Sequence, residues 1–70
     1  MSKKMVGRIK WFKPEKGYGY ILGADEESYY FEVSSIHGEI GSFNAGVKVL
    51  FIPNMFTEVS YALDIELYND

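Results

Sequence analysis

Residues 16–22 read Lys-Gly-Tyr-Gly-Tyr-Ile-Leu, so each of two nearby tyrosines follows a glycine. Tyr18 and Tyr20 are two positions apart, and in a β-strand their side chains point to the same face. Gly17 and Gly19 fall on the opposite face, where the missing side chain of Gly19 permits the strong curvature of a small barrel. The stretch therefore predicts a bent strand that carries two tyrosine rings on one face.

The segments on both sides of this stretch also have the alternation of β-strands rather than a helical period. Pro14 and Gly17 punctuate a turn before Tyr18, and Pro53 is expected to stop the fourth strand. Residues 34–46 are expected to form a long connection with one helical turn at 34–37. The expected strands are residues 5–12, 18–22, 29–33, 47–52 and 61–67. Five short strands predict an all-β chain, either a small antiparallel barrel or a sandwich.

Length and composition limit the classes of protein. Seventy residues are expected to form a single domain, residues 1–70, with the barrel at about 5–68. The chain has no cysteine, which fits a cytoplasmic setting, and no apolar run approaches a membrane span. Residues 1–20 hold six cations and one acid, whereas residues 21–70 hold one cation and nine acids. This asymmetry indicates either an anionic partner for the basic end or charge pairing across the fold.

Alternation assigns the strand residues to two faces. The expected core consists of Ile9, Ile21, Tyr29, Phe31, Val49, Phe51, Leu63 and Ile65. The outer face of the first three strands would then carry Lys10, Phe12, Tyr18, Tyr20, Tyr30 and Glu32. Trp11 nominally shares the face of Ile9, unless a bulge rotates it outward. Interleaved rings and cations suit single-stranded nucleic acid, because rings stack on bases and ammonium groups meet phosphates. Alternatively, Tyr18 and Tyr20 pack into a second small core under residues 34–46.

Two motifs resemble the bacterial cold-shock protein family: Gly7-Arg8-Ile9-Lys10-Trp11-Phe12 and Glu15-Lys16-Gly17-Tyr18-Gly19-Tyr20-Ile21. The resemblance is specific over residues 6–36. It implies a five-stranded antiparallel OB-type barrel that binds single-stranded RNA and DNA, as an RNA chaperone or regulator. It also implies that Trp11 lies at the binding rim. The binding residues that we expect are Lys10, Trp11, Phe12, Lys16, Tyr18, Tyr20, Tyr30, Glu32 and His37.

The sequence departs from the family in its second ribonucleoprotein motif. Where the family has a stacking histidine and a final phenylalanine, this chain has Glu32 and Val33. A carboxylate repels phosphates, or it accepts a hydrogen bond from a base amino group. We therefore expect weaker binding or an altered base preference. His37 is either a solvated loop residue or a secondary base contact, and Phe56 is either another such contact or a cap on the barrel.

The same residues exclude several other functions. One histidine, no cysteine and no phosphate-binding glycine motif speak against an enzyme, and no catalytic residue, metal site or cofactor is expected. The expected partner is single-stranded RNA or DNA, bound by a monomer, with no membrane. The alternative is a degenerate cold-shock-like barrel that presents Tyr18, Tyr20 and Tyr30 to a protein.

Overall fold

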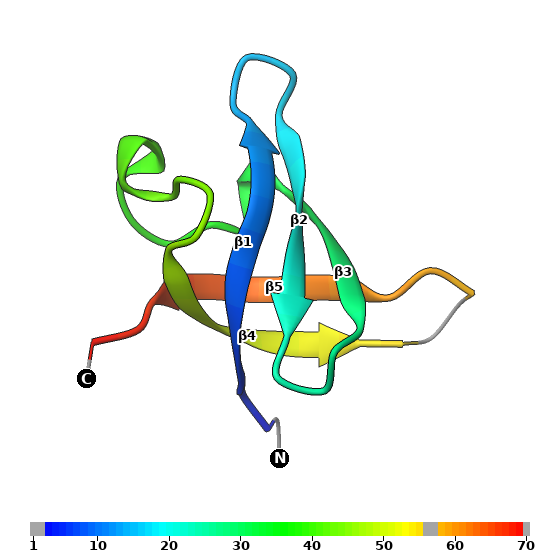
Figure 1. Cartoon of the computed structure of the whole chain (residues 1–70). Helices are drawn as coiled ribbons and strands as arrows, with labels where there is room; N and C mark the ends of the chain where they lie inside the picture. The colour runs from blue at the N-terminus through cyan, green and yellow to red at the C-terminus, as the bar shows by residue number, and fades with distance from the viewer. Residues whose placement is uncertain (1–2, 56–57, 70) are drawn as a thin grey trace.

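The computed structural model describes residues 3–55 and 58–69, and within them five strands close into a barrel (Figure 1). The strands are β1 (Met5–Lys13), β2 (Tyr18–Gly23), β3 (Ser28–Glu32), β4 (Lys48–Asn54) and β5 (Tyr61–Leu67). Two short 3₁₀ turns, η1 (Val33–Ser35) and η2 (Ile40–Ser42), lie in the connection from β3 to β4. The expected all-β, five-stranded barrel is confirmed. Phe56 lies outside the described residues.

The order of strands around the barrel is β1-β2-β3-β5-β4. Four of the neighbouring pairs are antiparallel, and the β3–β5 pair that closes the barrel is parallel, with Tyr30 opposite Tyr61. The β1–β2 turn uses Gly17 at a φ of 85°, a left-handed conformation that glycine adopts without a steric cost. Contrary to expectation, β4 continues through Pro53, which lies opposite Ala62 near the end of the strand.

A bulge in β1 decides the directions of two aromatic side chains. Ile9 lies opposite Ile21, but the register then shifts, so that Trp11 lies opposite Tyr20. Residues directly opposite each other share a face of the sheet, and Trp11 is therefore turned outward with Tyr20. Phe12 comes opposite Gly19 and is half-buried against the core. The prediction that Phe12 shares the outer face of Lys10 was therefore wrong, because the extra residue reverses the alternation after Lys10.

Gly19 fits where three segments crowd together. A Cβ atom at this position would lie 2.5 Å from the backbone oxygen of Trp11 and 2.8 Å from Cζ of Phe31. The ring of Phe12 packs 5.2 Å from the ring of Phe31, centroid to centroid, on the same side. The glycine between the two tyrosines thus leaves room for inward-facing rings.

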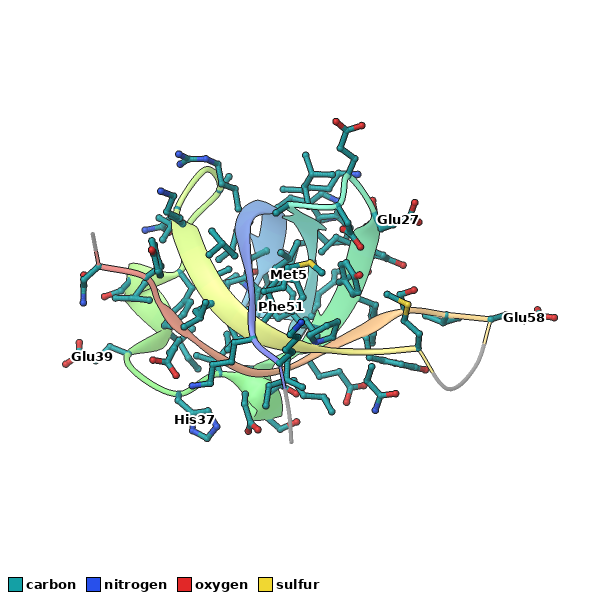
Figure 2. All side chains as sticks on the ribbon, turned by 90° about the horizontal axis from the view of Figure 1, so that it is seen from below. Met5, Glu27, His37, Glu39, Phe51 and Glu58 are labelled. Atoms are coloured by element: carbon teal, nitrogen blue, oxygen red, sulfur yellow. The ribbon has the colours of Figure 1, made fainter. Side chains whose placement is uncertain are left out.

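The core fills the barrel, and residues of the connection between β3 and β4 pack against it. Seven of the eight expected core residues are buried, and Ala62 and Phe43 are buried as well. Leu63 was expected in the core but is 36% exposed. Asp64 has a φ of 50°, which breaks the alternation of β5, so that Ala62 and Ile65 point inward although they are three positions apart. Figure 2 looks into the barrel from the end where Met5 and Phe51 lie near its axis.

The hydroxyl of buried Tyr29 donates a hydrogen bond to Oδ2 of Asp25 at 2.6 Å. Burial, reinforced by this carboxylate, raises the pKa of Tyr29 to about 12, whereas the hydrogen bond lowers the pKa of Asp25. A tyrosine in the unfolded chain ionises near pH 10. The unfolded state therefore loses its proton first as the pH rises, and the contribution of Tyr29 to stability is lost between about pH 10 and 12.

We expect the free energy of unfolding of the wild type to fall more steeply over this pH range than that of Tyr29→Phe. Urea denaturation at a series of pH values measures the difference, and Tyr68→Phe, at an exposed tyrosine, is the control. Parallel curves for the wild type and Tyr29→Phe would contradict the assignment.

Candidate functional site

Five aromatic side chains form a continuous group on the outside of the barrel, which we call the aromatic array. Its members are Trp11 of β1, Tyr18 and Tyr20 of β2, Tyr30 of β3 and Tyr61 of β5. The Trp11 centroid lies 5.5 Å from that of Tyr18 and 5.4 Å from that of Tyr20. Tyr30 lies 6.0 Å from Tyr18, 5.6 Å from Tyr20 and 5.6 Å from Tyr61. Tyr30 is thus in contact with three other rings of the array.

The register of the strands builds this array. Tyr20 lies opposite both Trp11 and Tyr30, and Tyr30 lies opposite Tyr61. Neighbouring rings make interplanar angles between 33° and 79°, so none of these pairs is stacked flat. Trp11 and Tyr61 are each 36% exposed, and the other three rings are half-buried. Ring surface therefore remains open to a flat ligand, and the rings do not pack under the long connection.

The cations of β1 and the following turn are exposed, and they lie at different positions relative to the array. Nζ of Lys13 is 5.7 Å from the centroid of the Trp11 ring. Nζ of Lys10 donates to Oγ of Ser28 at 3.1 Å and thereby reaches across β2 to the start of β3. Lys16 is exposed in the turn before Tyr18. Arg8 is exposed and donates from Nη1 to the carbonyl oxygen of Gly46 at 3.0 Å.

One anion belongs to the same surface. Glu32 is exposed, lies directly opposite Tyr18 and follows Tyr30 by two residues, so all three share a face. The hydroxyl of Tyr30 donates to Oε2 of Glu32 at 3.3 Å. The pKa of Tyr30 is raised, first by burial and then by the charge of Glu32. The surface of the array thus carries both cations and a carboxylate that shares a face with Tyr18 and Tyr30.

The structure brings most of the expected residues together, with two exceptions. Lys10, Trp11, Lys16, Tyr18, Tyr20, Tyr30 and Glu32 lie on or beside the array, whereas Phe12 points toward the core. His37 is exposed and contacts Asp64 of β5, with Nε2 2.9 Å from Oδ1. In Figure 2 the His37 ring projects from the side of the barrel opposite to Glu27. Glu27 precedes Ser28, which accepts the hydrogen bond from Lys10. His37 therefore lies outside the array as defined above, and a base contact by this residue stays a prediction.

Sequence reasoning missed Tyr61. Tyr61 begins β5, and the sequence predicted an antiparallel barrel in which the aromatic face belonged to the first three strands. The parallel pairing that closes the barrel places Tyr61 beside the middle of β3. In a closed barrel one further strand must pair with β3. The start of β5, where Tyr61 lies, is a candidate for that position.

Other features of the surface offer less chemistry. An open hollow with a mainly apolar surface is lined by residues 6–8 of β1, residues 22–24 at the end of β2, and Lys48. Within residues 3–55 and 58–69, no three His, Asp or Glu side chains gather closely enough to hold a metal ion. Nor does this part of the chain contain a helix with the length and apolar character needed to cross a membrane.

Comparison with known proteins identifies cold-shock proteins as relatives. The chain is 36% identical to cold shock-like protein CspJ of Salmonella typhimurium strain LT2 over 53 residues, which cover 73% of this chain and 76% of CspJ. It is 32% identical to cold shock protein CapB of Pseudomonas syringae pv. tomato over 53 residues, 74% of this chain and 77% of CapB. Identity to cold shock-like protein CspI of Escherichia coli strain K12 reaches 60%, but over 25 residues that cover 36% of each chain. No family model matches the sequence.

Among solved structures, a similar fold occurs in a chain described as drosophila Unr CSD456. The TM-score is 0.82 at 16% sequence identity, and the match covers 97% of this chain and 28% of that one. At this identity the likeness concerns the fold alone.

Proposed function

The chain belongs to the cold-shock protein family, and we propose that it binds single-stranded RNA or DNA through the aromatic array. Bases stack on the exposed ring surface, and the cations of β1 and its turn contact the phosphates. The observation that carries this proposal is the continuous contact of five outward-facing rings across four strands. Stacking on an aromatic side chain contributes about 1–3 kcal/mol per base and tolerates any sequence, because every base has a flat face.

The arrangement of charge supports a path for the backbone. Lys13 lies near the ring of Trp11, Lys10 reaches across β2 to Ser28, and Lys16 is exposed in the turn before Tyr18. A strand whose bases cover the array can place its phosphates near these cations. Tyr61 extends the stacking surface past β3, so that the proposed site has one more ring than the first three strands supply.

A titration with an oligothymidylate tests the proposal. Quenching of Trp11 fluorescence measures the affinity, and the titration is repeated at increasing salt concentrations. Three or four phosphate contacts release counterions, and the plot of log affinity against log salt should have a slope of roughly −2 to −3. Trp11 should be quenched because it lies inside the array. The proposal fails if the oligonucleotide leaves the Trp11 emission unchanged and the measured affinity does not depend on salt. An aromatic surface that instead docks a protein would respond little to salt.

Removal of the Glu32 charge should strengthen binding to oligothymidylate. Glu32→Gln keeps the length of the side chain but removes a negative charge from the face that carries Tyr18 and Tyr30. Repulsion of a nearby phosphate is screened by water, so we expect a gain of about two- to fivefold in affinity. Glu39→Gln is the matched control, since Glu39 is exposed in the β3–β4 connection (Figure 2). Equal gains for both variants would indicate a change in overall charge rather than a local effect.

A further inference from the structure

We propose that Glu32 reads the edge of a stacked base and favours guanine at one position of the bound strand. This inference rests on the proposed function of the array. It starts from the position of the carboxylate, which lies on the same face as the rings of Tyr18 and Tyr30. Directly opposite side chains in an antiparallel pair have Cβ atoms about 4.5–5.5 Å apart, a distance that an extended glutamate can span. A base on either ring therefore turns one of its edges toward Glu32.

The carboxylate has acceptor capacity to spare. Among the described residues, Glu32 accepts a hydrogen bond from the hydroxyl of Tyr30 at 3.3 Å, which is long for an O–H···O hydrogen bond. Within the described residues, the ion pairs join Lys4 to Glu66 and His37 to Asp64, and no cation pairs with Glu32. An ionised carboxylate accepts about four hydrogen bonds through its two oxygens. Glu32 is thus positioned to accept from a ligand rather than to stabilise the barrel.

The chemistry of the bases then selects among them. Guanine has two adjacent donors on its Watson–Crick edge, N1–H and the N2 amino group, which match the two oxygens of a carboxylate. Adenine and cytosine have one amino donor next to an acceptor nitrogen. Thymine and uracil have one N–H between two carbonyl oxygens, which a carboxylate repels. A good bidentate contact with a base discriminates by about 5- to 100-fold.

The test uses the whole chain and a series of hexanucleotides. In hexathymidylate, each position in turn is replaced by guanine, inosine, adenine or cytosine, and affinity is measured by quenching of Trp11 fluorescence. A single guanine excludes quadruplex formation. We expect one position at which guanine binds the wild type about tenfold tighter than thymine. Inosine, which lacks the N2 amino group, should recover only part of this gain.

Two variants separate reading of the base from a structural role. Glu32→Gln retains an oxygen acceptor for the Tyr30 hydroxyl but cannot accept two donors, so the guanine preference should disappear while binding persists. Tyr30→Phe removes the hydroxyl bond and keeps the ring, and the preference should remain. If the wild type and Glu32→Gln rank the bases identically at every position, Glu32 does not read the base. Absence of binding to every hexanucleotide would refute the proposed function itself, a result distinct from binding without a guanine preference.

Discussion

Replacement of Tyr30 by alanine is expected to lower the affinity for single-stranded oligonucleotides about 10- to 100-fold, the largest loss for any single ring. Tyr30 contacts Tyr18, Tyr20 and Tyr61, so its removal takes away one stacking surface and the lateral support of three others. Loss of one stacked base alone accounts for about 1–3 kcal/mol. Fluorescence anisotropy of a labelled oligonucleotide measures the change.

A matched control removes a tyrosine from another part of the surface. Tyr68 is 37% exposed, follows β5 and does not belong to the array. Its ring centroid lies 5.1 Å from Nζ of Lys48. Tyr68→Ala should bind as the wild type does, and thermal denaturation of both variants shows whether they are folded. A folded Tyr30→Ala with wild-type affinity would exclude the array as the stacking surface.

Replacement of Gly19 by alanine is expected to destabilise the barrel by about 3 kcal/mol, the upper end of the range for overpacking. The new methyl group would lie 2.5 Å from the backbone oxygen of Trp11 and 2.9 Å from Cα of Phe12. These are backbone atoms of the neighbouring strand, which a rotamer change cannot move. A domain of this length has a stability of about 4–10 kcal/mol, so the loss is a large part of the total.

Gly41→Ala is the control for this substitution, because a Cβ atom at Gly41 meets nothing within 4 Å. Urea denaturation of the two variants should show a marked fall in the midpoint for Gly19→Ala and little change for Gly41→Ala. Equal midpoints would mean that the strands separate easily at Gly19, and that the glycine is not required by packing.

The alternation of side chains predicted the strands and most of the core, because each face of β2, β3 and β4 follows a regular period of two. It failed where the backbone departs from that period. The bulge in β1 turns Phe12 inward, and the left-handed conformation of Asp64 turns Leu63 outward. Alternation alone did not decide which face of the sheet carries Trp11. The family resemblance indicated the rim, and its outward position beside Tyr18 and Tyr20 agrees with this, while its role in binding stays a prediction.

Two other misses arise from contacts between segments distant in sequence. Tyr61 joins the array only because β5 closes the barrel against β3, a pairing that no local pattern indicates. Phe43 belongs to a glycine-containing connection, yet it is buried at 1% exposure among core residues. Such positions depend on the closed barrel as a whole, whereas the pattern of Tyr18, Gly19 and Tyr20 is local and could be interpreted directly.

Chemical-shift mapping of the ¹⁵N-labelled chain during titration with an oligothymidylate tests most directly whether the array is the binding surface. We predict that the largest shifts occur at the indole N–H of Trp11 and at the amides of Tyr18, Tyr20, Tyr30 and Tyr61. Shifts concentrated instead on the outer face of β4, around Lys48 and Leu50, would contradict the assignment of the binding surface to the aromatic array.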